Sequence, residues 1–501
     1  MTLLNPSFAR IVVVGGGSAG WMTAAALVTG LHGRSTVEVV ESEEIGIVGV
    51  GEATFPSIRT YNKMIGIDEA EFLRATHGTY KLGIEFRDWS RLGERYFHTF
   101  GDFGQLGGPY ALWGQYRRLG DPALGGFDEQ CLPSVMAMAS RFVVPDAEAG
   151  EPYKWAYHFD AALYAAFLRE LAVRRGARRT EGRIVDIERH ADGRVRSLRL
   201  ADGRVLEGDL FIDCSGFGSL LLGKALGEPF VDFSHWLPVD GAWACPCERT
   251  QQAIAPYTSS TALEGGWAWR IPLQSRTGHG HVFSSRFIDA DRAREQLLQR
   301  LDGKPLAEPR LLRFTTGHRE RFWVHNVVAV GLSSGFLEPL ESTSIYLVQS
   351  SIGRLMALLT SAVPIDDAAV AAYNTGVVRQ FARIRDFIIL HYCLSGRRDS
   401  ELWRHVSAMA LPETLAFKIE AWRRFGILHT YDEEGFDATS WLAVHAGMRH
   451  WPEAADPVFG ELTTDAARQA LTRRRDAIAA SVSRLPVHHE FLDHMLSRRG
   501  H

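Results

Sequence analysis

The stretch RIVVVGGGSAG, residues 10–20, decides the fold of this chain. Its β-branched run over residues 10–14 ends in glycine, a pattern that predicts a buried strand. The segment 19–31, rich in Ala, Met and Leu, predicts a helix, and residues 37–40 predict a second strand that ends at Glu41. The chain therefore starts with a βαβ unit, the repeating element of α/β proteins.

The glycines of this stretch fit the spacing G-x-G-x-x-G. In that pattern Gly15 makes a tight turn, and Gly17 lets the backbone approach a pyrophosphate, which the helix N-terminus attracts. Gly20 permits close packing of helix on strand. Glu41, 21 residues beyond Gly20, can hold a ribose hydroxyl. We therefore predict a dinucleotide site.

Composition excludes several classes of protein. The chain has 501 residues, 46% hydrophobic and 23% charged, with a formal net charge of −4. Disordered, collagen-like and coiled-coil classes do not fit these values, and no Lys/Arg block indicates a nucleic-acid partner. No apolar run reaches about 18 residues and no secretory signal is visible, so we expect a cytoplasmic protein without a membrane partner. Five scattered cysteines predict reduced thiols and no metal site.

Later segments extend the first unit. Residues 160–175 predict a helix, and 184–188, 194–200 and 205–206 predict a three-stranded meander with Asp-Gly turns, leading into the apolar run 210–212.

The second half of the chain changes character. Residues 280–287 predict one strand among loops, and after Glu341 the chain is mostly helical. We expect a sheet-containing domain over 8–395 and a helical region over 396–501 that caps the substrate site.

Two further segments distinguish FAD from NAD. Residues 209–216 and 327–331 are strand–glycine segments that resemble the elements returning to the flavin in FAD-dependent monooxygenases. In that class a sheet insertion interrupts the βαβ unit. The resemblance implies an α/β, FAD-binding monooxygenase-like fold, a Rossmann βαβ unit with a sheet insertion, plus the helical C-terminal region.

Four motifs narrow the resemblance. Residues 267–272 read WAWRIP, 49–56 read GVGEATFP, 80–89 read YKLGIEFRDW and 335–343 read GFLEPLEST. In this order they resemble the WxWxIP motif, the flavin strap, the active-lysine segment and the catalytic-glutamate segment of the flavin-dependent tryptophan halogenases.

This resemblance implies FADH2-dependent halogenation of an indole- or tryptophan-type aromatic, with O2 and bromide or chloride. Hypohalous acid would be handed to Lys81, and Glu341 would stabilise the cationic ring and accept its proton. The chain has no second nucleotide fingerprint. A separate flavin reductase, bound transiently, must therefore supply FADH2; a homodimer is compatible with the sequence.

The resemblance also assigns binding residues. Thr343 and Ser344 would hold the halide, although the family has glycine where Ser344 stands, a departure that would narrow or reshape the halide site. The residues expected to bind FAD are Gly15, Gly17, Ser18, Ala19, Glu41, Ala53, Ile184, Leu332 and Ile345.

The substrate site is only partly recognisable. His98 and Phe100 resemble the family's indole sandwich, and Trp267 and Trp269 would lie between flavin and substrate. The Tyr-Tyr pair that clamps free tryptophan has no counterpart; residues 439–443 are the nearest stretch. Indole or a substituted indole therefore fits as well as tryptophan, and a clamp, if present, is expected between 425 and 451.

Two other functions stay open on the same fold. An FAD-dependent aromatic hydroxylase or monooxygenase would yield a hydroxylated product in the presence of halide. A non-catalytic flavoprotein would not need Lys81 and Glu341 to converge, so a separation beyond about 10 Å would favour it.

Overall fold

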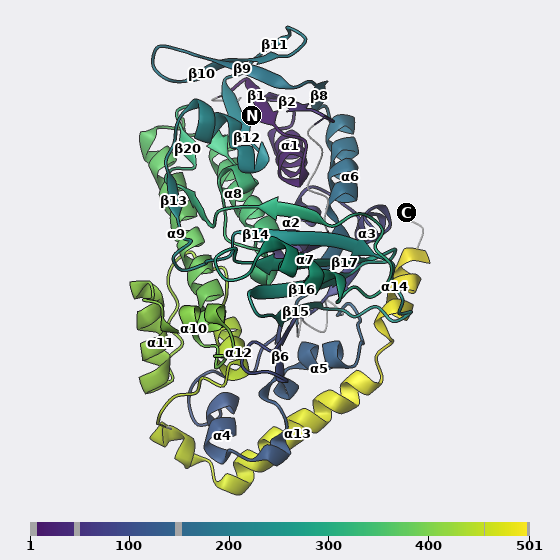
Figure 1. Cartoon of the computed structure of the whole chain (residues 1–501), viewed down its shortest axis with the longest axis vertical. Coiled ribbons are helices and arrows are strands. Elements are labelled where there is room, and N and C mark those ends of the chain that lie inside the picture. Colours follow the sequence, from purple (N-terminus) through teal and green to yellow (C-terminus); the bar gives the residue numbers. More distant parts are fainter. Residues whose placement is uncertain (1–7, 45–50, 146–152, 455, 498–501) are drawn as a thin grey trace.

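A computed structural model describes residues 8–44, 51–145, 153–454 and 456–497. One end of the molecule holds a six-stranded sheet in the order β20-β21-β12-β1-β2-β8, in which β1 is parallel to β2 and β12 (Figure 1). The predicted βαβ unit and both later strand–glycine segments are confirmed in it. Its elements are β1 (Arg10–Val14), α1 (Ser18–Leu31), β2 (Thr36–Glu41), β8 (Arg178–Glu181), β12 (Leu210–Asp213), β20 (Trp323–Val324) and β21 (Val327–Ala329).

Strand β1 is apolar on both faces because both faces are covered. Ile11 and Val13 belong to the main hydrophobic core, whereas Val12 and Val14 belong to a second cluster on the opposite face. A strand buried on both sides reads as a continuous apolar run, as residues 11–14 do. On the main-core side, α1 packs against α6 (Ala161–Arg174) and α8 (Ser344–Leu359).

The predicted meander is confirmed as an antiparallel sheet at the end of the molecule (Figure 1). Gly193 and Gly203 both have φ of +89°, the left-handed conformation that each Asp-Gly turn requires. Its strands are β9 (Ile184–Arg189), β10 (Val195–Leu200) and β11 (Val205–Glu207).

A seven-stranded sheet fills the centre, and the sequence indicated only parts of it. The predicted strand 280–287 is wrong over 284–287, because the amide of Phe287 donates to the carbonyl of Ser284 and closes a turn there. In strand order the sheet comprises β18 (Arg310–Arg313), β14 (Gly241–Cys247), β17 (Thr277–Phe283), β16 (Gly266–Pro272), β15 (Thr258–Ala262), β5 (Gly83–Arg87) and β6 (Arg95–Thr99).

Two small sheets connect these layers. One has the order β3-β7-β4 and carries Ala53 and Lys81; Gly49 and Val50 of the strap motif lie outside the described residues. The other has the order β13-β19-β22. Their strands are β3 (Gly51–Ala53), β7 (Ala156–Asp160), β4 (Thr79–Lys81), β13 (Phe230–Asp232), β19 (Gly317–Arg319) and β22 (Gly335–Phe336).

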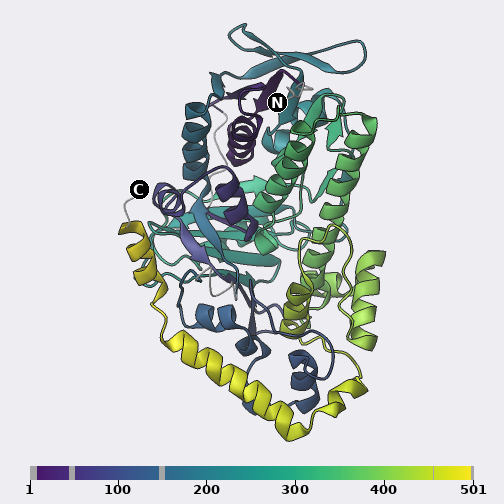
Figure 2. The same ribbon diagram turned by 180° about the vertical axis from the view of Figure 1, so that it is seen from behind.

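The C-terminal region is helical, as predicted. From behind, α13 crosses the end opposite the six-stranded sheet and leads to α14, which packs against α3 and β4 (Figure 2). The proposed division into 8–395 and 396–501 stays a prediction. Within the described ranges, no helix is long and apolar enough to cross a membrane. The remaining α-helices are α2 (Ser57–Met64), α3 (Glu69–Ala75), α4 (Leu112–Leu119), α5 (Leu132–Met138), α7 (Ala290–Leu298), α9 (Asp367–Cys393), α10 (Glu401–Ala408), α11 (Glu413–Phe425), α12 (Ala438–Gly447), α13 (Thr464–Ser483) and α14 (His488–Ser497).

The β1–α1 turn depends on the absence of side chains. Gly15 has φ of +112°, and a Cβ atom at Gly20 would lie 1.8 Å from the Gly15 carbonyl oxygen. We therefore expect Gly20→Ala to lower the free energy of unfolding by about 1–3 kcal/mol, the usual cost of overpacking. Gly353→Ala is the matched control, because this α8 glycine has open space around its Cβ position. Urea unfolding of both variants checks the prediction, and equal midpoints would contradict it.

Candidate active site

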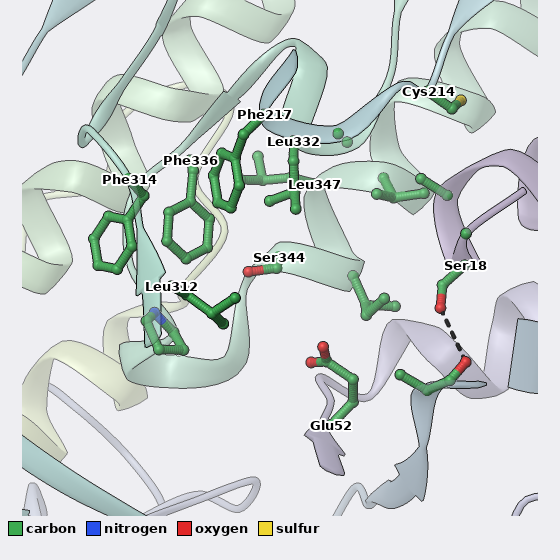
Figure 3. Close-up of a pocket in the computed structure, with 18 of the residues that line it drawn as sticks. Ser18, Glu52, Cys214, Phe217, Leu312, Phe314, Leu332, Phe336, Ser344 and Leu347 are labelled. Carbon is green, nitrogen blue, oxygen red and sulfur yellow. Dashed lines mark hydrogen bonds between the residues drawn. The ribbon is translucent and has the colours of Figure 1, made fainter. Parts of the chain in front are cut away.

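A cavity of about 770 Å³ extends from the N-terminus of α1 to the N-terminus of α8. Figure 3 shows Ser18 at one side and Ser344 nearer the other, with Glu52 between them. All nine residues expected to bind FAD line it: Gly15, Gly17, Ser18, Ala19, Glu41, Ala53, Ile184, Leu332 and Ile345.

The end of the cavity at α1 fits a dinucleotide phosphate. A Cβ at Gly17 would meet nothing within 4 Å, so the backbone borders open space there. Gly17 is also the N-cap of α1, whose first amides have no partner within the helix. Free amides and the positive end of the helix dipole attract an anion. The residues present therefore fit the pyrophosphate of FAD.

Glu41 reaches the cavity from the end of β2. Its carboxylate accepts a hydrogen bond of 3.1 Å from Nε1 of Trp21 and is bonded to Arg179. A Cβ at Gly16 would lie 1.4 Å from Glu41 Oε2. Gly16 is thus constrained like Gly15, although the G-x-G-x-x-G spacing leaves that position free.

The opposite end of the cavity holds the candidate halide residues. Thr343 and Ser344, at the start of α8, line it together with Glu341, Trp267 and Trp269. The two indole rings come from alternate residues of β16, with centroids 6.2 Å apart. The N-terminus of a sixteen-residue helix beside hydroxyl groups suits a halide ion.

An aromatic group that sequence reasoning missed lines the same region. Phe314 and Phe336 pack edge to face at 4.9 Å, and Phe217 lies 5.5 Å from Phe336 (Figure 3). Their rings provide an apolar wall for a flat heterocycle. Phe336 belongs to the 335–343 motif, but Phe217 and Phe314 come from separate segments outside the four motifs, so no local pattern could have shown that the three rings meet.

Lys81 is fully buried beside this cavity, at the end of β4. Its Nζ donates hydrogen bonds of 2.9 Å to the carbonyl oxygen of Thr54 and to Oγ of Ser342. Burial lowers the pKa of Lys81 to about 7, and the charge of Glu341 acts against that shift. The amine is therefore partly neutral at neutral pH, and it lies beside the residue that follows Glu341.

Glu341 is held by two histidines. Nδ1 of His98 lies 2.9 Å from both carboxylate oxygens, and Nε2 of His391 lies 2.9 Å from Oε1. Burial alone would raise the pKa of Glu341, but the imidazoles outweigh burial and hold the pKa at about 2. The carboxylate is therefore ionised. Lys81 and Glu341 converge, which a non-catalytic flavoprotein would not require.

The backbone around Glu341 is strained. Glu341 and Ser342 have φ of 65° and 60°, left-handed values that cost non-glycine residues about 1–3 kcal/mol each. The turn is held by the hydrogen bond from Lys81 to Ser342 and by the contact of His98 with Glu341. Glu338, which we interpret from the sequence as structural, is buried and accepts 3.1 Å hydrogen bonds from the Tyr392 hydroxyl. Burial raises the pKa of Glu338 to about 8.

The four predicted substrate residues separate into two groups. Trp267 and Trp269 line the cavity, whereas His98 and Phe100 lie on the Lys81 side. The Phe100 ring centroid is 5.3 Å from Lys81 Nζ and 5.8 Å from the ring of Phe55. The His98 ring lies 5.6 Å from the ring of Phe387 and 6.1 Å from that of Phe436.

Phe436 covers this side. Its ring stacks on Phe387 at 3.8 Å and lies 6.1 Å from His98 and 5.3 Å from Phe55. Phe436 ends the segment between α11 and α12, inside the range where a clamp was expected. Phe436 and His391 gave no signal in the sequence, because their contacts join segments distant along the chain.

Three consecutive acids tie the same segment down. Asp432 pairs with Arg379 at 2.5 Å and with Arg383 at 3.2 Å. The next two acids, Glu433 and Glu434, are paired with Arg354 and Lys418 respectively. Their charges are therefore already balanced by protein cations.

Comparisons with known proteins agree with this geometry. The protein family described as "Tryptophan halogenase" matches residues 10–464. The chain is 33% identical to the 7-chloro-L-tryptophan 6-halogenase KtzR of Kutzneria sp., over 97% of this chain and 99% of that protein.

Two solved structures are more similar. BrvH, a flavin-dependent halogenase from Brevundimonas sp. BAL3, shares 42% identity with a TM-score of 0.92, covering 97% of this chain and 99% of that one. Xcc4156, a flavin-dependent halogenase from Xanthomonas campestris, shares 40% identity with a TM-score of 0.93, covering 98% and 99%. The predicted fold class is confirmed by both.

Flavin-dependent halogenases use FADH2 and a halide ion, act on small aromatic substrates and need a separate flavin reductase. This chain belongs to the flavin-dependent tryptophan halogenase family and is a flavin-dependent halogenase.

Proposed function

We propose that this enzyme halogenates an indole-type aromatic and that Lys81 receives the oxidised halogen. The contact of Lys81 Nζ with Ser342, beside the ionised carboxylate of Glu341, carries this proposal. The bound cofactor, with O2 and halide, supplies hypohalous acid on the cavity side of this contact. The protein binds the cofactor through the nine residues around the α1 turn and the α8 N-terminus.

Lys81 can serve in both of its protonation states. A charged amine donates a hydrogen bond to hypohalous acid and polarises it, whereas a neutral amine can take up the halogen as a haloamine. Either form keeps a reactive oxidant at one fixed point. The hydrogen bonds to Thr54 and Ser342 set the direction of the Nζ atom.

Glu341 would then act on the substrate. Attack by the ring creates a positive charge, which the ionised carboxylate stabilises before it accepts the ring proton. His98 and His391 fix its oxygens, each at 2.9 Å. In this proposal His98 positions Glu341. This role is additional to the contact with the indole ring that the sequence predicts for His98.

The halide would bind at the N-terminus of α8, near Thr343 and Ser344. The helix dipole and the hydroxyl groups favour an anion there. Ser344 replaces the glycine expected from the family and adds a hydroxyl group to this space.

The substrate would lie on the Lys81 side, among His98, Phe100 and Phe436. Relatives named tryptophan halogenases act on tryptophan or chlorotryptophan. In this chain Asp432, Glu433 and Glu434 of the α11–α12 segment are paired with cations, so these three acids offer a substrate ammonium group no free charge. We therefore favour a substrate recognised by its ring.

The family match favours a halogenase over the aromatic hydroxylase that the sequence left open, and product analysis with and without halide checks this. We further propose that the enzyme works in the cytoplasm, which its five free cysteines support. A homodimer stays a prediction.

Lys81→Ala tests the central role. We expect halogenation to fall by about 100-fold or more, while FAD binding and flavin oxidation persist, because the amine acts after the oxidant forms. The assay contains FAD, NADH, a flavin reductase, bromide or chloride and indole, and mass spectrometry detects the product. Lys63→Ala, at an exposed position of α2, is the control. Wild-type product yield from the Lys81 variant would refute the proposal.

Lys81 should also make stability depend on pH. Its pKa is 10.5 in the unfolded reference and about 7 when buried. Between about pH 7 and about pH 10.5, Lys81 is therefore protonated in the unfolded chain but neutral in the folded one. Over this range Lys81 makes the free energy of unfolding rise by about 1.4 kcal/mol per pH unit. Lys81→Met should lack that rise, and Lys63→Met should keep it. Urea unfolding at about pH 7.5 and about pH 8.5 provides the test. If the free energy of unfolding changed equally with pH in Lys81→Met and in the wild type, the buried amine would not titrate in this range.

Substrate recognition by ring faces predicts a preference. Stacking adds about 0.5–1.5 kcal/mol per aromatic pair, whereas tryptophan's zwitterion must be desolvated without a charged partner. We expect kcat/KM for indole to equal or exceed that for tryptophan, with halogenation at C3, the most electron-rich carbon. A strong preference for tryptophan would contradict this prediction. The first candidate to bind the ammonium group of tryptophan would then be Glu434, because its Oε2 atom is buried without a hydrogen bond.

A further inference from the structure

Glu52 is a second acid in the flavin cavity that the proposed mechanism does not use. It is the central residue of the short strand β3, paired opposite Phe159 of β7. Its carboxyl group points into the cavity between Ser18 and Ser344 (Figure 3). Within the described ranges, the carboxyl group of Glu52 makes no hydrogen bond or ion pair.

The charged groups on the strands around β3 are engaged with one another. Asp160, at the end of β7, is bonded to Arg276 at 2.7 Å. Arg270 of β16 and His279 of β17 both pair with Asp302, at 2.7 Å and 3.5 Å. No cation among them is left to balance an ionised Glu52.

The other charged groups of the cavity lie at its two ends. Glu41 is bonded to Arg179 and lies 3.8 Å from Arg169, and Glu341 is held by its histidines. Arg183 pairs with Glu44 at 3.5 Å, and Glu43 with Arg179 at 3.0 Å. Arg310 also lines the cavity, and no ion pair joins it to Glu52.

A carboxyl group in this position prefers its neutral form. Burial raises the pKa of Glu52 to about 7 in the empty cavity. FAD brings negatively charged phosphates into the same low-dielectric space, and like charges disfavour ionisation further. A neutral carboxyl group can instead donate an O–H hydrogen bond to an acceptor on the dinucleotide.

We propose that Glu52 is protonated in the flavin-bound enzyme, so that binding of the dinucleotide takes up one proton. This inference rests on the proposed placement of FAD in this cavity. Below neutral pH Glu52 already carries the proton, and the affinity for FAD is at its full value. As pH rises above the pKa of the free enzyme, each FAD molecule must bind together with a proton, and the affinity falls.

Quenching of FAD fluorescence at several values between about pH 6 and about pH 9 measures this dependence. For the wild type we expect the Kd to be flat at low pH and to rise towards tenfold per unit above neutrality, the slope for one proton. Glu52→Gln keeps the shape of the side chain without titrating, so its Kd should stay near the low-pH wild-type value throughout.

Two controls isolate Glu52. Glu43→Gln removes an exposed acid that also lines the cavity, and it should keep the wild-type slope. Lys81→Met removes the other group with a pKa of about 7. This variant should keep most of the pH dependence of the Kd for FAD, because Lys81 does not line the cavity.

Calorimetry of the wild type and of Glu52→Gln provides an independent measurement of proton uptake. Binding enthalpies in two buffers of different ionisation enthalpy, near pH 8, should reveal uptake of close to one proton; Glu52→Gln should show close to none. FAD binding with a flat Kd and no proton uptake would overturn this inference alone. The same holds if Glu52→Gln kept the wild-type slope. Absence of FAD binding at every pH would overturn the flavin placement as well.

Discussion

The buried amine of Lys81 is the group on which the rest of the site depends. Its hydrogen bonds to Thr54 and Ser342 join strand β4, the segment after β3 and the turn before α8. A charged amine is costly to bury, so the surrounding structure must provide acceptors and a compensating carboxylate. The left-handed turn at Glu341 and Ser342 brings both within reach. The arrangement of Lys81 beside Glu341 and the local backbone strain therefore have the same origin.

The site has two sides with different chemistry. The cavity side has helix N-termini and backbone amides at its two ends, which suit phosphate and halide anions, and an apolar aromatic wall. The Lys81 side is built from aromatic rings, with Glu341 as an ionised group among them. Between them, the amine of Lys81 is hydrogen-bonded to Thr54 and Ser342. In the proposed function, this arrangement would separate the source of the oxidant from the ring that consumes it.

Sequence reasoning succeeded where function depends on local geometry. The glycine turn at residues 15–20, the Asp-Gly meander and the WxW strand are each specified by neighbouring residues, and the structure has all three. It failed where contacts are long-range. His391 meets Glu341 from a helix 50 positions later, and the seven-stranded sheet pairs β5 with β15 across more than 170 positions. Nothing in the local sequence encodes such pairings.

Helix α9 presents three contacts at a spacing of four residues. Arg383 holds the backbone and carboxylate of Asp432, Phe387 stacks on Phe436, and His391 reaches Glu341. Four-residue steps keep all three on one face of the helix. The position of Phe436 and the orientation of the Glu341 carboxylate therefore both depend on the same register of α9. Substitutions on the outer face leave that register intact, whereas one inserted residue between Arg383 and His391 would rotate the later contact by about 100° relative to the first. In this family member, helix length is therefore under a stricter constraint than helix composition.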